Sequence, residues 1–285
     1  MNNMKSNKLE KTMVFFQSNN FLNAILELTI KSGFEDFAFR IVNKDYLDKR
    51  KLFFEQHSEL IEKNIDLLYD EKSKKVYEGL ILYRKYRKRK YFPYYSAKDQ
   101  YFPEDVIKLN ENEIFVDCGA FEGDTAQEFL KLVNSNYKKI VCFEPDKSNY
   151  EILLETLKNY DNVIAINKGV FDKKQVISFD SGRKGSSTIS EEGRVQIEVD
   201  KIDDIPECND VTFLKMDIEG SEPEALIGAQ ETIKRNKPKL AICIYHSDED
   251  MINIIGQVHD LVPEYKIFVR QHSIYETETV LYCTL

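Results

Sequence analysis

Three carboxylates stand where chemistry would need them, each at the end of a short and mostly apolar run: Asp117, Glu144 and Asp217. The carboxyl ends of parallel strands meet at one edge of a sheet, so we expect these acids to converge on one crevice. Three carboxylates would repel a pyrophosphate, whereas they suit a ligand that carries a sulfonium and an amino group. The charge pattern therefore favours S-adenosylmethionine (SAM) over NAD.

A turn of small residues follows Asp117 and leads into a helical pattern that begins at Thr125. Gly119, Ala120 and Gly123 in this turn would let backbone N–H groups and a helix N-terminus approach a ligand closely. The spacing of the two glycines is not the G-x-G-x-x-G of dinucleotide sites. A tight strand-to-helix turn without a ligand is the alternative interpretation.

Glu144 belongs to the segment Phe143-Glu-Pro-Asp146 at the end of the second predicted strand. A carboxylate at this place can accept hydrogen bonds from both hydroxyls of a ribose. The alternative is a surface acid at the start of a helix, where Asp146 is itself a good N-cap.

His246 ends the strand that follows Asp217 in the chain. An unperturbed histidine pKa of ~6.5 suits a general base that takes a hydroxyl proton. A hydrogen-bonded loop histidine is the alternative. The alternative for the acids after the fourth strand is stabilisation of the N-terminus of the next helix, which explains Glu222 and Glu224 but not Asp217.

The elements that must position these residues alternate between strand and helix, which predicts a doubly wound α/β fold with a mostly parallel seven-stranded sheet. Only about eight residues separate the last two strands, Lys266–Arg270 and Thr279–Tyr282, so they must form an antiparallel hairpin. Such an ending is typical of SAM methyltransferases rather than dehydrogenases. The other expected strands are Ile114–Cys118, Ile140–Glu144, Val163–Asn167, Phe213–Met216 and Lys239–Tyr245, with Val176–Phe179 and Gln196–Val199 as an extra pair.

Residues 1–100 form a predicted helical domain or arm, and residues 101–285 form the α/β domain, with 101–110 as a linker between them. The helical part ends in a basic run at 84–90 that is interleaved with tyrosines. This run indicates either an anionic partner or a solvated helix end. The apolar and aromatic N-terminal helices are a possible homodimer face.

Charge is divided unevenly within the net charge of -9: residues 1–100 hold 20 basic and 14 acidic residues, and residues 101–285 hold 20 basic and 35 acidic. The acidic balance of the α/β domain argues against a track for nucleic-acid phosphates, and DNA is not an expected partner. The five cysteines show no C-x-x-C spacing and suit core thiols. Without an apolar run of the ~20 residues that a transmembrane helix needs, we expect a cytoplasmic protein.

Residues 101–285 resemble the FkbM-type methyltransferase family. The segment Asp66–Tyr77 also resembles the helical lead-in of bacterial members. The resemblance of the α/β domain lies in four segments: Phe115–Thr125, Phe143–Asp146, Phe213–Glu222 and Lys237–His246.

This resemblance implies a class I SAM-dependent O-methyltransferase that acts on a hydroxyl of a sugar or sugar nucleotide, in a surface polysaccharide or a natural-product glycan. It places Asp117, Gly119 and Gly123 at the methionine half of SAM, Glu144 at the ribose, and Asp217 near the transferred methyl. His246 and Asp217 are the predicted catalytic residues. The full predicted cofactor set is Asp117, Gly119, Ala120, Gly123, Asp124, Thr125, Glu144, Pro145 and Asp217.

No Asp/Asn-Pro-Pro-Tyr follows the fourth strand, which counts against amino methylation of DNA bases. Related sugar methyltransferases hold Mg²⁺ at the ends of strands four and five, where Asp217, Glu219 and His246 stand. One histidine with two carboxylates is an imperfect set for an ion that prefers oxygen, so Mg²⁺ is not favoured and no metal ligand is predicted.

The loop Ser186–Thr188 and the aromatic residues around Tyr101 are candidate walls for the acceptor. Two alternatives remain open. One is an RNA methyltransferase that uses the basic run, and the other is a non-catalytic nucleotide-binding module.

Overall fold

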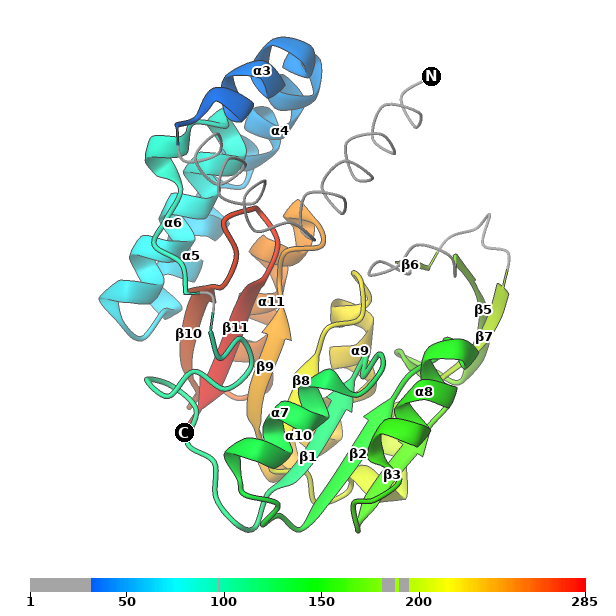
Figure 1. Cartoon of the computed structure of the whole chain (residues 1–285). Helices are drawn as coiled ribbons and strands as arrows, with labels where there is room; N and C mark the ends of the chain where they lie inside the picture. The colour runs from blue at the N-terminus through cyan, green and yellow to red at the C-terminus, as the bar shows by residue number, and fades with distance from the viewer. Residues whose placement is uncertain (1–31, 97, 181–187, 190–194) are drawn as a thin grey trace. The chain divides into compact units, whose positions relative to one another are not determined.

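The computed structural model describes residues 32–96, 98–180, 188–189 and 195–285, and the chain divides into two compact units (Figure 1). One unit contains the described residues up to 58 together with residues 77–93, and the other contains residues 59–76 and 94–285. The chain therefore enters the second unit, returns to the first, and then completes the second. The domain boundary expected at residue 100 remains a prediction.

The first unit is helical. A buried carboxylate organises it: Asp36 accepts hydrogen bonds from Tyr83 Oη at 2.5 Å and from Arg87 Nε at 3.0 Å. Its elements are α3 (Phe34–Val42), α4 (Lys44–Gln56), the second half of α6 (Glu71–Tyr86) and the 3₁₀ helix η1 (Arg89–Tyr91).

The basic run is partly consumed inside this unit. Arg84 is only 2% exposed. Arg87 pairs with Asp36, and its guanidinium lies 4.6 Å from the centre of the Phe39 ring. The run is therefore not simply a solvated helix end, because two of its cations are used for packing.

Several apolar side chains of α3 are exposed, and the homodimer remains a prediction.

The second unit contains a seven-stranded sheet in the order β10-β11-β9-β8-β1-β2-β3. The pairs from β9 to β3 are parallel, whereas β11 is antiparallel to both β9 and β10, which confirms the expected hairpin. The strands are β1 (Ile114–Cys118), β2 (Lys139–Phe143), β3 (Val163–Ile166), β8 (Phe213–Met216), β9 (Lys239–Cys243), β10 (Lys266–Gln271) and β11 (Thr279–Thr284).

A smaller sheet of four strands, in the order β4-β7-β5-β6, follows β3 in the chain. The expected extra pair is confirmed, since β5 and β7 run antiparallel. The strands are β4 (Gly169–Val170), β5 (Gln175–Asp180), β6 (Thr188–Ile189) and β7 (Val195–Asp200).

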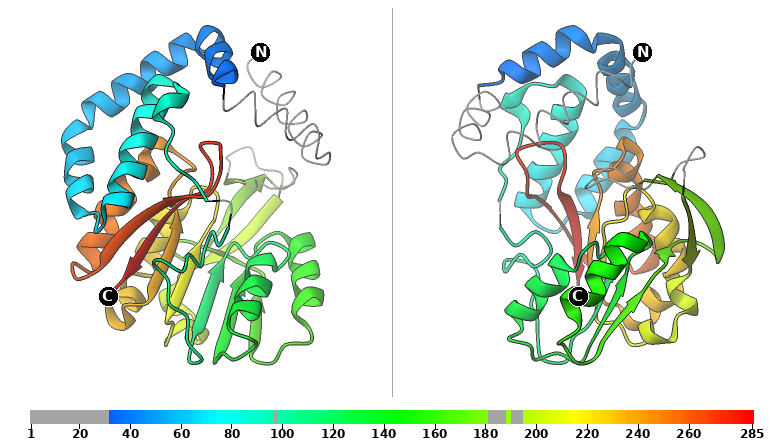
Figure 2. Two further views of the ribbon diagram at one scale, coloured as in Figure 1. Left: turned by 60° about the vertical axis from the view of Figure 1, so that its left-hand side comes forward. Right: turned by 45° about the vertical axis from the view of Figure 1, so that its right-hand side comes forward.

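Helices cover both faces of the seven-stranded sheet, as a doubly wound fold requires (Figures 1 and 2). They form one group on each face. One group contains α7 (Asp124–Leu132) and α8 (Lys147–Leu157); the other contains α9 (Glu222–Gly228), α10 (Gln230–Asn236) and α11 (Asp248–Leu261), with the 3₁₀ helices η2 (Ile202–Asp204) and η3 (Pro206–Cys208) before them in the chain. The expected cap of α8 is confirmed, because Asp146 accepts hydrogen bonds from Ser148 N and Asn149 N.

Aromatic rings form the centre of the core between the sheet and its helices. Phe115 stacks on Phe129 with ring centroids 4.7 Å apart, and Phe102 meets Phe213 edge-on at 5.6 Å. Residues 101–110 are thus not the expected linker, because Tyr101 and Phe102 are 7% and 3% exposed and pack into this core. All five cysteines are free and buried, as expected for core thiols.

The segment 59–76, with α5 (Ser58–Leu67) and the start of α6, packs on the β10 edge of the sheet. Leu68 forms a parallel bridge with Ile267, and Tyr69 N donates a hydrogen bond to Ile267 O at 2.8 Å. Residues 59–76 therefore belong to the same compact unit as the α/β sheet, although they precede the α/β domain in the sequence.

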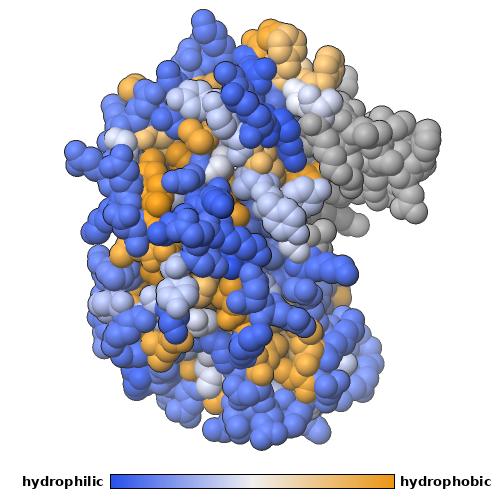
Figure 3. All heavy atoms as spheres, turned by 90° about the vertical axis from the view of Figure 1, so that its left-hand side faces the viewer, coloured by the Kyte–Doolittle hydropathy of each residue, from blue (hydrophilic) through white to orange (hydrophobic). Residues whose placement is uncertain are grey.

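Membrane-spanning helices are not found in the described part of the chain, where no helix is both long and apolar enough. On the face drawn in Figure 3, hydrophobic side chains are interspersed with hydrophilic ones.

Candidate active site

The strand order brings the predicted site residues to one edge of the sheet. β1 pairs with β8, and β8 pairs with β9, all in parallel. The ends of these strands carry Asp117, Asp217 and His246. The expected convergence follows from this arrangement.

Asp117 is fully buried, and its partner is a lysine that the sequence analysis did not select. Lys215 Nζ lies 2.9 Å from Asp117 Oδ1 and also donates a hydrogen bond to Gly119 O at 2.8 Å. Burial alone would lower the pKa of Lys215, but the charges of Asp117 and Asp217 raise it above its usual value. The signal in the sequence was a lysine inside the apolar strand Phe213-Leu-Lys-Met216.

Asp217 is held from two sides. Tyr101 Oη donates a hydrogen bond to Asp217 Oδ2 at 2.7 Å, and Tyr245 Oη approaches Oδ1 at 3.4 Å. Burial raises the pKa of Asp217, but pairing with His246 and the charge of Lys215 hold it well below its usual range. The side chain is 22% exposed, so a fixed, ionised carboxylate faces the solvent at this edge.

His246 lies among three carboxylates. Its Nε2 is 3.3 Å from Asp217 Oδ1 and 3.6 Å from Glu219 Oε2, and its Nδ1 is 3.1 Å from Glu222 Oε1. Burial would lower the pKa of His246, yet pairing with Asp217 and Glu222 raises it to about 11. The imidazole is therefore protonated at neutral pH in this arrangement.

Glu222, one of the acids expected at the N-terminus of the helix after the fourth strand, also contacts His246 in the structure. It is fully buried and accepts hydrogen bonds from Ile218 N at 2.8 Å and Gly220 N at 2.9 Å. These bonds close the loop after β8 and aim the carboxylate at His246. Glu219, at the tip of this loop with φ +60°, has a pKa that burial raises to about 7.

Donor atoms of Asp217, Glu222 and His246 lie within 4.8 Å of one another, close enough to contact one metal ion. Both imidazole nitrogens, however, face carboxylate oxygens. The Glu222 oxygens already accept two backbone N–H groups. Mg²⁺ prefers an octahedral set of oxygens, so these donors fit a protonated imidazole better than Mg²⁺.

The glycine turn is tightly packed by protein atoms. The backbone N–H groups of Gly119 and Ala120 both donate to Phe143 O at 3.0 Å. A Cβ on Gly119, whose φ is +79°, would lie 1.9 Å from Asp217 O, and a Cβ on Gly123 would lie 3.0 Å from a Leu153 methyl. Close packing therefore accounts for these small residues, and their place in a SAM site remains a proposal.

Glu144 is 5% exposed at the end of β2. Its carboxylate accepts hydrogen bonds from Phe121 N and Asp146 N, each at 2.9 Å. Burial raises the pKa of Glu144 to about 7, although these two bonds counteract part of the increase. The side chain is thus fixed beside the glycine turn, and its role at a ribose stays a prediction.

The other predicted cofactor residues lie around the same turn. Asp124 and Thr125 begin α7, with Asp124 exposed and Thr125 buried, and Pro145 is half-buried after Glu144. No contact among them distinguishes a ligand role from a structural one.

The structure fully describes only one of the two regions that were predicted to line the acceptor site. Tyr101 is buried, its hydroxyl is used by Asp217, and Lys215 Nζ lies 5.0 Å from the centre of its ring. It supports the carboxylate rather than forming an open wall. Ser186 and Ser187 lie outside the described residues, and of Thr188 only the backbone in β6 is described.

Comparison with known proteins gives one family. The family model "Methyltransferase FkbM domain" matches residues 117–271, which is more than half of the chain. Among solved structures, methyltransferase FkbM from Methylobacillus flagellatus is similar, with a TM-score of 0.70 and 24% identity over 82% of this chain. At that identity the likeness shows the fold, and this chain spans 60% of the length of that protein. No curated protein matches the chain.

Other solved structures match with lower scores. Fibrillarin from Aeropyrum pernix, with bound SAM, matches with a TM-score of 0.38 and 14% identity, covering 64% of this chain and 71% of its own. An rRNA methylase from Streptococcus thermophilus matches with a TM-score of 0.39 and 15% identity, covering 61% of this chain and 87% of its own. These scores are too low to carry an argument. The seven-stranded sheet itself has the Rossmann-like methyltransferase architecture.

Proposed function

Because the chain belongs to the FkbM methyltransferase family, we propose that it transfers the methyl group of SAM to a hydroxyl of a sugar or sugar nucleotide. The observation that carries this proposal is the surplus of carboxylates at the carboxyl edge of the sheet. Asp217, Glu219 and Glu222 surround one imidazole, while Asp117 lies with Lys215 behind them. A ligand with a sulfonium and an ammonium group would find favourable charge there.

The residues that would hold SAM lie around the glycine turn. Glu144 would accept the ribose hydroxyls, and Asp217 would face the sulfonium. The methionine part would lie near the turn that contains Gly119 and Gly123. When bound, SAM supplies an electrophilic methyl group. The protein contributes a fixed geometry that aligns the acceptor oxygen with this methyl, and alignment of this kind removes much of an activation barrier.

The acceptor hydroxyl must lose its proton, and we assign this step to His246 with the help of Asp217. His246 carries a proton in the ligand-free arrangement. A sulfonium next to Asp217 adds positive charge and lowers the pKa of the imidazole. Glu219 is the neighbouring group whose pKa of about 7 also suits this task.

The decisive experiment is calorimetric titration of the full chain with SAM, followed by incubation with methyl-labelled SAM and a panel of nucleotide sugars. We expect saturable SAM binding and label transfer to at least one sugar. Absence of SAM binding would end the enzyme proposal. SAM binding with label transfer only to total RNA would replace the sugar acceptor by RNA.

A further inference from the structure

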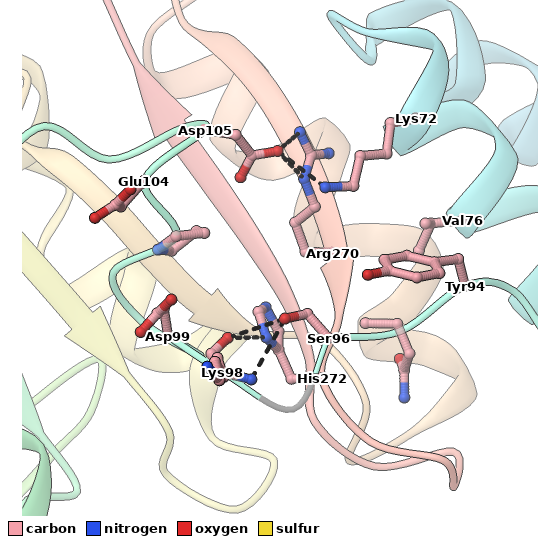
Figure 4. Close-up of a pocket in the computed structure, with 12 residues that line it drawn as sticks. Lys72, Val76, Tyr94, Ser96, Lys98, Asp99, Glu104, Asp105, Arg270 and His272 are labelled. Atoms are coloured by element: carbon pink, nitrogen blue, oxygen red, sulfur yellow. Dashed lines mark hydrogen bonds and ion pairs between the residues drawn. The ribbon is translucent and has the colours of Figure 1, made fainter.

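A cavity of about 230 Å³ lies in the sheet unit at the carboxyl end of β10 (Figure 4). Side chains from three regions line it: Lys72 and Val76 at the start of α6, several residues between Tyr94 and Asp105 that the structure describes, and Arg270 to His272 at and just after the end of β10. The proposed methyl transfer does not use any of these side chains.

Ion pairs hold one wall of the cavity. Arg270 is 4% exposed and pairs with Asp70 at 2.7 Å and with Asp105 at 3.0 Å. Asp105 also pairs with Lys72 at 3.0 Å. Because these pairs tie α6 and the 94–105 stretch to β10, the cavity is preformed.

A second set of contacts fixes the opposite wall. His272 Nε2 lies 2.8 Å from Tyr282 Oη, and its Nδ1 lies 3.3 Å from Lys98 O. Burial lowers the pKa of His272 to about 4, so this ring is neutral at physiological pH. Because both ring nitrogens have protein partners, the ring forms a fixed and uncharged part of the wall.

The charges of the lining balance. Lys72, Lys98 and Arg270 are cationic and face three acids, of which Asp105 pairs with two of the cations. The other acids are Asp99 and Glu104. A phosphate would meet the acids, and a bare cation would meet the basic groups, so neither gains much from this lining.

The composition instead suits a neutral ligand that both donates and accepts hydrogen bonds. Carboxylates, ammonium groups and the Ser96 hydroxyl lie around the cavity, and Figure 4 shows the Tyr94 ring directed into it. Tyr94 is 73% exposed, so its ring is free to stack on an apolar face. Sugar rings offer an apolar C–H face and a rim of hydroxyls. The volume lies below the ~300–1,000 Å³ of drug-sized sites and so suits a single ring.

We propose that this cavity binds one saccharide unit of the methyl acceptor, next to the unit that is methylated. The inference rests on the proposed function. The connection between the two sites is short: Lys98 and Asp99 line the cavity, and Tyr101 two residues further on donates to Asp217. A second connection runs through Glu278. His272 N donates a hydrogen bond to Glu278 O at 2.9 Å, and the Glu278 carboxylate accepts a hydrogen bond from Gln100.

Ligand-observed NMR on the full chain without SAM tests the cavity directly. The probes are methyl glycosides of glucose, galactose, mannose and N-acetylglucosamine. We expect at least one to bind, and Tyr94→Ala to weaken that binding by about 10-fold through loss of the stacking surface. Glu104→Gln, which keeps the shape and removes the charge, should also weaken it. Tyr160→Ala is the matched control, because Tyr160 is partly exposed after α8 and outside the cavity.

Several results would overturn the proposal: no glycoside binds, Tyr94→Ala binds as well as wild type, or inorganic phosphate binds and displaces the glycoside. SAM calorimetry on the same variants separates this inference from the proposed function. SAM binding without glycoside binding removes the cavity proposal alone. Glycoside binding that depends on Tyr94 in a protein that does not bind SAM removes the methyl-transfer proposal, and the cavity then remains a saccharide site.

Discussion

Lys215 Nζ lies 2.9 Å from Asp117 Oδ1, and the side chains of both residues are at most 2% exposed. A buried ion pair contributes little net stability, but removing one partner leaves an uncompensated charge in the interior. The pair therefore makes the base of the site sensitive to single substitutions.

We expect Lys215→Met to destabilise the protein by about 3–5 kcal/mol, because it leaves Asp117 unpaired beside Asp217. The free energy of unfolding in urea measures the change. Lys237→Met is the control, since Lys237 forms a 2.6 Å pair with Glu264 in which both side chains are well exposed. Loss of such a pair should cost less than about 1 kcal/mol. Equal losses in the two variants would contradict a special role for Lys215.

Gly119→Ala should destabilise the protein more than the addition of one methyl group usually does. The new Cβ would lie 1.9 Å from Asp217 O, and the residue has φ +79°. A destabilisation above about 2 kcal/mol is expected in urea unfolding. Gly256→Ala in α11 is the matched control, because its Cβ would meet nothing within 4 Å. That substitution should be neutral or stabilising by up to about 1 kcal/mol. Similar midpoints of urea unfolding for the two variants would refute close packing as the reason for glycine at position 119.

SAM affinity should depend on pH through Glu144. Burial raises the pKa of this carboxyl to about 7, and only the ionised form accepts both ribose hydroxyls. Binding should therefore tighten by roughly tenfold between about pH 6 and pH 8, as the carboxyl loses its proton. Calorimetry with Glu144→Gln should show weaker binding without this dependence. Glu155→Gln on the exposed face of α8 should behave as wild type. A pH dependence that survives in Glu144→Gln would assign it to another group.

His246→Gln should lower turnover by roughly 10²–10⁴-fold through loss of proton removal. It should not weaken SAM binding, because it removes a positive charge near the sulfonium. The pKa of His246 is raised to about 11, so wild-type turnover should keep rising with pH above neutrality. A plateau reached near pH 7 that disappears in Glu219→Gln would instead make Glu219 the proton acceptor.

Methyl transfer by purified protein should not require a divalent metal. The nitrogens of His246 face carboxylates, and Glu222 is occupied by the Ile218 and Gly220 N–H groups. Turnover measured after EDTA treatment should match untreated protein within about twofold, since Mg²⁺ would find few free oxygens here. Activity that falls with EDTA and returns with Mg²⁺ would contradict this expectation.

The strands and the convergence of the acids could be predicted from sequence. Asp117 and Asp217 end apolar runs, and the ends of parallel strands meet at one edge whatever the loops do. The same rule located His246, and the short spacing of the last two strands required a hairpin. These inferences use only local pattern and topology.

The contact partners of these residues could not be predicted. They depend on the register between neighbouring strands and on contacts between segments that are far apart in the sequence. Lys215 meets Asp117 only because β8 lies beside β1 in a particular register. Tyr101 reaches Asp217 across 116 residues of sequence. Periodicity identified helices before residue 90, but it could not show that residues 59–76 pack on β10.

The contact of Leu68 and Tyr69 with Ile267 has a practical consequence for dissecting this protein. β10 is the outermost strand of its sheet, and an uncovered edge strand invites pairing with other chains. A fragment that starts at residue 94 would keep every strand and helix of the α/β fold after that point, yet it would lose Asp70 and Ser73 as partners of Arg270. Such a fragment should self-associate through its bared edge, so a fragment that keeps the α/β unit intact must include residues 59–76.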